Sequence, residues 1–288
     1  MNELTAVKAV NEIDSSVTQQ PHKTAPTVTS TPSDIEVKIA KELRAIDEML
    51  MLQVPAGIFP VGQYAGEIAL NMDANPPLEM YLDDFWIDQL EVSNAQYSRC
   101  IEAGVCQETP YEYDLAFKRP NYPAVAVSKG DAEAYCGWVD GRLPSEEEWR
   151  YAAGGAQGLI YPWGNEFAMG EANFCDKQCP YPFKNTNYDD GSVRTAPVGS
   201  YPNGASWVGA MDMSGNVWEW VKDWYPENYY EGSAFQFPSD AKTDGLAGSL
   251  GGSWLDDNYG LRISNRLVVV SNYRSTYIGF RCVSDVKP

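Results

Sequence analysis

The sequence contains a single histidine, His22, among its 288 residues. Zinc fingers, histidine-bound iron centres and catalysis by a serine or cysteine nucleophile all need a histidine near the reacting atoms. His22 lies in a polar N-terminal stretch without apolar periodicity. The sequence therefore argues against most hydrolases and against histidine-dependent metalloenzymes.

Long apolar runs and basic residues are also scarce. No stretch approaches the roughly 18 consecutive apolar residues that a membrane-spanning helix needs. Lys and Arg number 21 against 40 Asp and Glu, a formal net charge of -19. Such a field repels phosphate backbones. We expect no transmembrane segment and no nucleic-acid partner, while the acidic charge can serve solubility alone or the holding of cations.

The cysteines are even in number, and without nearby histidine they favour disulfides over metal ligation. Disulfides imply an oxidising compartment, so we expect an extracytoplasmic or cell-surface protein. The first residues, MNELTAVKAV, are too polar for a signal peptide, and we therefore see none in this chain. The six cysteines are Cys100, Cys106, Cys136, Cys175, Cys179 and Cys282.

Three segments are predicted along the chain. Residues 1–32 are rich in Thr, Ser, Pro and Val and are expected to be a disordered tail or linker. Residues 33–52 are expected to form a helix, capped at Ser33 or Asp34, that packs on or leads into the domain; a coiled-coil stalk is the alternative. Residues 53–288 are expected to form one domain. The apolar face of the predicted helix comprises Ile39, Leu43, Ile46 and Leu50.

Within the domain, short strands and tight turns alternate with three predicted helices. Capping boxes begin at Ser93 and Ser145, each with Gln or Glu three residues later, and Ser128 opens a further helix. Long loops rich in Gly, Asn and Asp follow the third helix. Loops of this length are uncommon unless they are functional or are held by metals or disulfides.

Six motifs occur in one order along the chain: EVSNAQY (91–97), GRLPSEEEWRYAAGG (141–155), YPWGNEF (161–167), GNVWEW (215–220), GGSW (251–254) and GFRC (279–282). Together they closely resemble the formylglycine-generating, or sulfatase-modifying-factor, family over residues 54–283. The resemblance implies an α+β, C-type-lectin-like fold with few helices, small antiparallel sheets and much ordered loop. Four tryptophans of these motifs, Trp149, Trp163, Trp218 and Trp220, are expected in the core.

The resemblance also implies one disulfide, between Cys136 and Cys282. The remaining cysteines form two pairs that are close in sequence, Cys100–Cys106 and Cys175–Cys179, and each is expected to close a local loop. A CxxxC metal site is the rival interpretation of the last pair.

Two structural calcium sites follow from the resemblance, because hard cations prefer oxygen ligands. The alternative is that Asp190 and Glu219 only cap turns. The first implied ligand set is Asn173, Phe174, Asp190 and Ser192. The second is Ser214, Gly215, Val217 and Glu219.

The oxidase of the resembled family uses two cysteines after the GGS-aromatic motif to bind copper and engage its substrate. Counted from Ser253, those positions hold Asp256 and Leu261. Thiolates are the ligands that Cu(I) prefers, so no copper is expected here. Ser253 without a base is a weak nucleophile. We name no catalytic residue.

The stretch LDDNYGLRISNRLVVVSNYRSTYI, residues 255–278, contains no Glu, Lys, Gln, Met or Trp. A frame of arginines, Arg262, Arg266, Arg274 and Arg281, runs through and just past it. This bias resembles the variable region of retroelement-diversified proteins of the same fold; a chance gap in an inactive homologue is the alternative. Its aromatic and small polar residues suit a binding surface. The expected ligand-binding residues are Trp254, Asp256, Asp257, Asn258, Tyr259, Asn265, Asn272, Tyr273 and Tyr277.

Three functions remain open at this point. The first is a non-catalytic module that binds a protein or small-molecule ligand at residues 254–277 and is diversified or not. The second is a sulfatase-modifying-factor-type oxidoreductase that works without the cysteine pair. The third is a structural surface domain attached to a partner through the predicted N-terminal helix.

Overall fold

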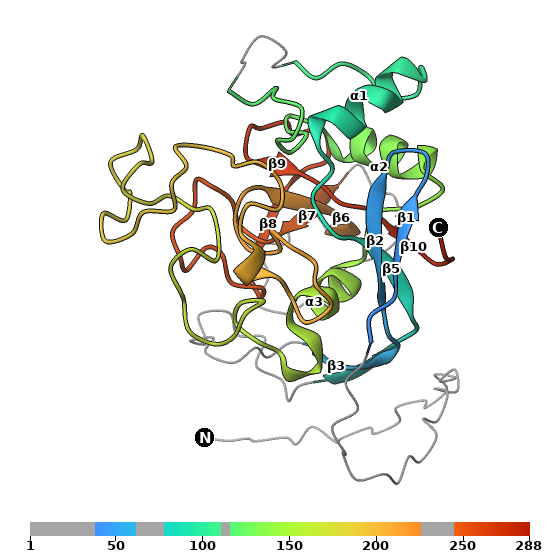
Figure 1. Ribbon diagram of the computed structural model, residues 1–288, viewed down its shortest axis with the longest axis horizontal. Helices are drawn as coiled ribbons and strands as arrows, with labels where there is room; N and C mark the ends of the chain where they lie inside the picture. The colour runs from blue at the N-terminus through green and yellow to red at the C-terminus, as the bar shows by residue number, and fades with distance from the viewer. Residues whose placement is uncertain (1–37, 62–77, 111–115, 226–244) are drawn as a thin grey trace, which may run out of the picture. The chain divides into compact units, whose positions relative to one another are not determined.

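The computed structural model describes residues 38–61, 78–110, 116–225 and 245–288 (Figure 1). The predicted tail, residues 1–32, lies outside the described residues. The strands are β1 (Lys41–Arg44), β2 (Met49–Val54), β3 (Gly57–Val61), β4 (Leu78–Leu82), β5 (Phe85–Asp88), β6 (Trp218–Tyr225), β7 (Leu246–Leu250), β8 (Arg266–Val270), β9 (Ile278–Gly279) and β10 (Val283–Ser284). The helices are α1 (Asn94–Glu102), α2 (Lys129–Trp138), α3 (Glu146–Gly154) and the short 3₁₀ turns η1 (Gly155–Gln157) and η2 (Pro202–Gly204).

The described strands form three small sheets. One has the order β1-β2-β5-β10, one pairs β3 with β4, and one has the order β8-β7-β6-β9. All neighbours are antiparallel except β6 and β9. The last strand, β10, pairs with β5, so the C-terminal strand shares a sheet with the N-terminal hairpin (Figure 1). Long ordered loops link the remaining elements, so the predicted α+β class with few helices, small sheets and much ordered loop is confirmed.

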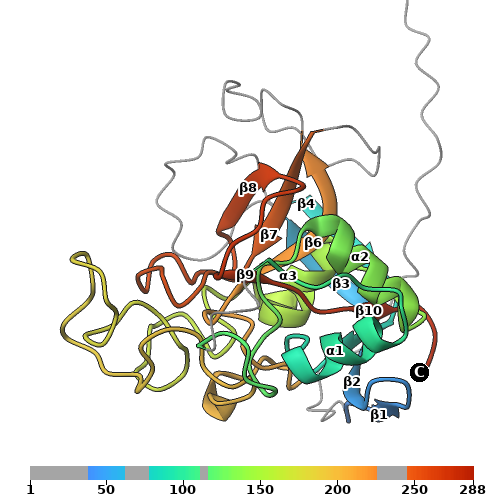
Figure 2. The same cartoon turned by 90° about the horizontal axis from the view of Figure 1, so that it is seen from above.

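The three predicted helix starts are confirmed in detail. Ser93, Ser128 and Ser145 are the N-caps, and each begins a complete capping box. In each box the serine side-chain oxygen accepts a hydrogen bond from the backbone N–H three residues on. The side chain of that third residue in turn accepts a hydrogen bond from the serine backbone N–H. The helix α2 contacts α1 and β6, and α3 contacts β6 as well; Figure 2 gives the view from above.

The predicted helix over residues 33–52 is wrong where the structure describes it. Residues 41–54 form the β1–β2 hairpin, with Glu48 at φ 60° in the turn. Leu43 and Ile46, which the helix would have buried, are 59% and 44% exposed. Pairing of β2 with β5 buries Leu52 and Val54 instead. An apolar run such as MLML fits either period, and tertiary pairing overrides weak helical propensity.

Aromatic side chains fill the interior between the sheets and helices. Trp149 of α3 and Trp220 of β6 are fully buried, and Trp218 is 7% exposed. Trp163 is only half-buried, and it stacks on Tyr161 at 5.1 Å between ring centroids. Three of the four predicted core tryptophans are therefore core, and the fourth borders a loop cluster.

The predicted disulfides are all confirmed: Cys100–Cys106, Cys136–Cys282 and Cys175–Cys179. The Cys136–Cys282 bridge joins α2 to the residue before β10 and spans 146 residues of sequence. Closing so long a loop stabilises the folded state by about 4–5 kcal/mol in the chain-entropy description.

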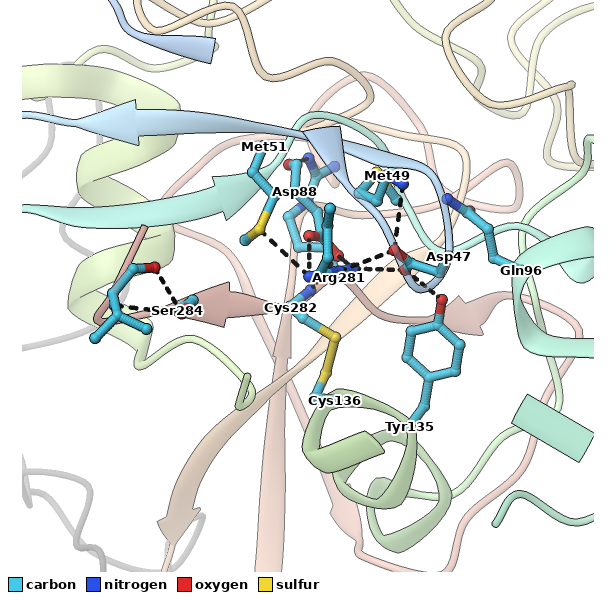
Figure 3. A network of polar contacts seen from close by, with 12 residues as sticks. Asp47, Met49, Met51, Asp88, Gln96, Tyr135, Cys136, Arg281, Cys282 and Ser284 are labelled. Atoms are coloured by element: carbon cyan, nitrogen blue, oxygen red, sulfur yellow. Dashed lines mark hydrogen bonds and ion pairs between the residues drawn. A yellow bond between two sulfur atoms is a disulfide. The ribbon is translucent and has the colours of Figure 1, made fainter. Parts of the chain in front are cut away.

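A buried ionic network anchors the hairpin to the rest of the domain. Arg44 donates to Asp47 at 2.9 Å and pairs with Asp88 of β5 at 2.9 Å. The Tyr135 hydroxyl of α2 donates to Asp47 at 2.7 Å, and the Cys282 amide donates to Asp88 at 2.9 Å. Figure 3 shows Tyr135 and Cys282 converging on these carboxylates. Burial raises the pKa of Asp88 to about 6, although Arg44 opposes the shift.

Replacing Arg44 by alanine should lower the free energy of unfolding by about 3–5 kcal/mol, because two buried carboxylates lose their cation. Urea unfolding followed by tryptophan fluorescence measures the loss. Arg99→Ala is the matched control. Its partner Glu48 is exposed and water screens the pair, so stability should hardly change. Equal losses in the two variants would contradict this role for Arg44.

Candidate recognition face

The two positions that carry cysteine in the resembled oxidase hold very different side chains. One oxygen of Asp256 accepts three hydrogen bonds: from the Ser253 hydroxyl at 2.6 Å, the Ser253 amide at 3.0 Å and the Trp218 indole at 2.9 Å. Leu261 is fully buried in an apolar cluster with Tyr161 and Phe174. All six cysteines of the sequence lie in the described part and are paired.

Glycines shape the loop that presents Asp256. Gly251 and Gly252 have φ values of +99° and +74°, which side-chain-bearing residues rarely adopt. A Cβ on Gly252 would lie 2.7 Å from the Leu261 side chain and 2.8 Å from the Gly260 carbonyl. The GGSW motif therefore folds back tightly, and the loop returns to Leu261 directly beside its own start.

The Asp256 carboxylate has no counter-ion within the described residues. Burial raises its pKa, and the hydrogen bonds from Ser253 and Trp218 oppose the shift. The neighbouring Asp257 adds to the shift in the upward direction. The Oδ1 atom of Asp256 makes no hydrogen bond to any described residue, because all three bonds go to its Oδ2 atom. The carboxylate is thus hydrogen-bonded through Oδ2, while Oδ1 stays available to a partner from outside the described residues.

Aromatic residues surround this carboxylate. Trp254 is 3% exposed, donates its indole N–H to the Thr276 carbonyl at 3.1 Å and packs in one cluster with Phe117 and Tyr277. The hydroxyls of Tyr273 and Tyr277 lie 2.7 Å apart. The structure therefore brings together four of the predicted ligand-binding residues: Trp254, Asp256, Tyr273 and Tyr277.

The other predicted ligand-binding residues lie further along the loops. Asp257 caps the turn by accepting from the Tyr259 amide at 3.0 Å, and Asn265 donates to the Tyr259 carbonyl at 2.5 Å. Tyr259 itself is 60% exposed, with the Arg262 guanidinium 5.0 Å from its ring centroid. Asn258 is half-buried and Asn272 is exposed.

Two aromatic residues at this surface escaped the sequence reasoning. Tyr181 and Phe183 are 41% and 60% exposed, and their rings stack at 5.5 Å. Tyr181 also lies 6.3 Å from Trp254, centroid to centroid. Their loop follows the Cys175–Cys179 bridge, and the Cys175 amide donates to the Asp256 carbonyl at 2.8 Å. The sequence CPYPF (179–183) alternates prolines with aromatic residues, which is typical of an aromatic loop. Only the fold shows that this loop lies near Trp254.

We use the term recognition face for six residues of these neighbouring loops, of which Trp254 is buried: Tyr181, Phe183, Trp254, Asp256, Tyr273 and Tyr277.

Three arginines of the predicted frame are held by the scaffold rather than by the recognition face. Arg266 pairs with Glu146 of α3, and Arg274 pairs with Asp131 of α2. Arg281 makes a fully buried, bidentate pair with Glu219 of β6. The residues between these arginines therefore lie on a fixed support.

The first implied calcium ligand set contains one buried oxygen without a hydrogen-bond partner among the described residues. Asp190 accepts from the Phe174 amide at 2.8 Å and from the Ser192 amide at 2.7 Å. Asn173 donates its amide to Asn216 at 2.9 Å, which leaves its Oδ1 buried without a hydrogen-bond partner among the described residues. Burial raises the pKa of Asp190 to about 7. Asp190 does cap its turn, yet an orphaned oxygen beside a desolvated carboxylate fits a hard cation.

The second implied ligand set does not fit a cation. Both oxygens of Glu219 are taken by Arg281, at 2.7 Å each, and one also accepts from the Trp149 indole at 2.6 Å. The guanidinium thus occupies the charge position that calcium would need. The remaining members, Ser214, Gly215 and Val217, would contribute only carbonyls. No cluster of three or more His, Cys, Asp or Glu in the described ranges is placed to hold a metal.

Residues 37–286 match the sulfatase-modifying factor enzyme 1-like domain. The chain belongs to this family. The formylglycine-generating enzyme of Streptomyces coelicolor is 42% identical over 173 residues, which cover 58% of this chain and 54% of that protein. The inactive C-alpha-formylglycine-generating enzyme 2 of Bos taurus is 35% identical over 169 residues, 57% of this chain and 50% of its own length. The chain thus spans about half of each of these relatives.

Solved structures of family-like proteins share the fold. PvdO of Pseudomonas aeruginosa superposes with a TM-score of 0.68 at 25% identity, covering 86% of this chain and 98% of that one. Treponema denticola variable protein 1 superposes with a TM-score of 0.61 at 18% identity, covering 86% and 99%. The sulfatase-modifying-factor domain of this chain therefore has the C-type-lectin-like architecture that the motifs predicted.

The disulfides bear on where this family member resides. Its three disulfides point to an extracytoplasmic compartment or the endoplasmic reticulum. In the described ranges, no helix has the length and apolar character that crossing a bilayer requires.

Asp256→Asn should become more stable relative to the unchanged protein as pH rises from about 4 to about 7. The folded state raises the pKa of Asp256, so its protonated form favours folding at low pH and that contribution disappears as pH rises. Asparagine keeps an acceptor and removes the titration. Urea unfolding at several pH values tests this, and a relative stability that falls toward neutral pH would contradict it.

Proposed function

We propose that this family member is a non-catalytic binding module that engages a protein or small-molecule ligand at the recognition face. The observation that carries the proposal is the identity of the residues at positions 256 and 261, where the resembled oxidase has its two cysteines. One is an aspartate fixed by Ser253 and Trp218, and the other is a leucine buried in the core. With every cysteine in a disulfide, the described chain has no thiolate for Cu(I).

The range of named relatives is consistent with this proposal. The family includes the Streptomyces coelicolor protein named as an enzyme and the Bos taurus protein named as inactive. Membership therefore does not decide between catalysis and binding, and the residues at the two thiol positions carry the choice.

Retroelement diversification is the finer form of the proposal. Exposed positions lie before and between the anchored arginines: Asp257 and Tyr259 precede Arg266, and Asn272 lies between Arg266 and Arg274. Their substitution would leave the ion pairs of these arginines intact. The Treponema denticola variable protein supports the fold of such a module and nothing more. Sequencing the flanking DNA tests it: a reverse transcriptase gene and a near-identical template repeat are expected, and absence of both overturns the diversification.

The purified protein should neither bind Cu(I) nor consume oxygen with a cysteine peptide, since it offers no free thiolate. Copper is measured by titration against a chromogenic chelator, and oxygen with an electrode. The Streptomyces coelicolor relative serves as the positive control. Conversion of the peptide cysteine to its aldehyde would establish the rival function, an oxidoreductase of the sulfatase-modifying-factor type.

A structural calcium ion at the first ligand set completes the proposed module. It would bind Asn173 Oδ1 and the Asp190 carboxylate, with the Phe174 and Ser192 carbonyls, and would hold the loop beside the recognition face. No calcium is proposed at Glu219, because Arg281 occupies its carboxylate.

Adding about 1 mM calcium should raise the thermal midpoint of unfolding, because an ion that binds only the folded state stabilises it. Asn173→Ala and Asp190→Asn should each abolish the rise. Asp189→Asn is the control, since that exposed carboxylate pairs with Lys177 and lies outside the ligand set. A rise that persists in Asp190→Asn would refute the site.

A further inference from the structure

We propose that the recognition face takes an alkylammonium group, with the Asp256 carboxylate as its counter-ion and the stacked rings of Tyr181 and Phe183 as its wall. The inference rests on the binding role proposed above and names the chemistry of the ligand.

The first support is an uncompensated charge. The Asp256 carboxylate is half-buried, its Oδ1 is without a hydrogen bond, and no ion pair reaches it from the described residues. Two nearby basic residues are paired elsewhere: Lys177 with Asp189, and Arg274 with Asp131. Lys184, next to Phe183, is exposed and makes no ion pair with Asp256. A carboxylate with one oxygen free of protein hydrogen bonds and no ion pair can accept a charge-assisted hydrogen bond from a cation.

The second support is a row of aromatic rings that already holds one cation. Phe117, Trp254, Tyr181 and Phe183 follow one another, with centroid distances of 6.1, 6.3 and 5.5 Å. At the Phe117 end, the Arg194 guanidinium lies 5.3 Å from the ring centroid. At the other end, Tyr181 and Phe183 are 41% and 60% exposed. Such faces attract organic cations through the ring quadrupole.

The arrangement selects against other ligand classes. A divalent metal would want six or more oxygens, and the recognition face offers a single carboxylate. An anion would meet Asp256, Asp257 and a chain with a net charge of -19. An alkylammonium ion combines a positive head for the carboxylate with methylenes that can lie along the rings.

Isothermal titration calorimetry with defined probes tests the inference. The probe is Nα-acetyl-lysine methylamide, and the neutral comparison is Nα-acetyl-norleucine methylamide, which has a similar chain without the charge. Butylammonium serves as a free amine: tighter binding of the lysine derivative assigns the source to a lysine side chain, and equal binding assigns it to free amines. We expect measurable binding of the cations and none of the neutral compound.

Variants locate the contact. Asp256→Asn should weaken binding of the lysine probe about tenfold or more, because the counter-ion is lost while the fold is kept. Tyr181→Ala and Phe183→Ala should each weaken it about threefold. Asp83→Asn removes one exposed charge from the β4–β5 turn and should leave binding unchanged. Near-ultraviolet circular dichroism confirms that each variant is folded.

Three outcomes would overturn the inference: equal binding of the neutral compound, an equal loss in Asp83→Asn, or no binding of either cation up to about 10 mM. The last result would leave the non-catalytic role standing, because the copper and oxygen measurements test that role separately. Aldehyde formation in those measurements would remove the proposed function whether or not ammonium binds.

Discussion

The buried pair between Arg281 and Glu219 is the interaction on which the rest of this domain depends. Both side chains are completely buried. The guanidinium also donates to the carbonyls of Asp88 at 3.1 Å and Met211 at 2.7 Å, while Glu219 accepts from Trp149. One ion pair thus ties β6, the C-terminal strand, α3 and the end of β5 together. Because a buried charge is tolerated only when it is fully paired, these elements have one mutual arrangement.

Further buried acids, Glu91 and Asp212, lie near that pair, so the guanidinium of Arg281 faces more than one carboxylate. Burial raises the pKa of Glu91 well above its ordinary range, and the neighbouring Asp212 and Glu219 add to the shift. Burial likewise raises the pKa of Asp212 to about 6. The single guanidinium is therefore shared by an excess of carboxylates. A divalent ion at Glu219 would have to displace it, and this is why we propose calcium only at the first of the two implied sites.

Because buried ion pairs and disulfides hold the scaffold, the residues of the surface loops can vary without disturbing it. The disulfides, Arg266, Arg274 and Arg281 make their contacts within the scaffold. Asp256 and Leu261 therefore need suitable partners only among the residues around them. Asp256 obtains it from Ser253 and Trp218, and Leu261 from an apolar cluster. The same framework can thus support an oxidase or a binding surface, and the loop residues determine which.

Much of this was readable from the sequence, because it depends on local chemistry or on motif order. The capping boxes at Ser93 and Ser145 need only residues three apart, and the six ordered motifs predicted the family and the Cys136–Cys282 disulfide. The hairpin at 41–54 was missed because its apolar run fits a helix as well, and only pairing with β5 decides the outcome. The fit of Asn173 with Asp190, and the capture of Glu219 by Arg281, required the folded chain, since each depends on residues far apart in sequence. The sequence alone determined the fold family and the loss of the thiol pair; the tertiary structure decided which side chains surround Asp256, because burial and contact belong to the packed chain rather than to its order.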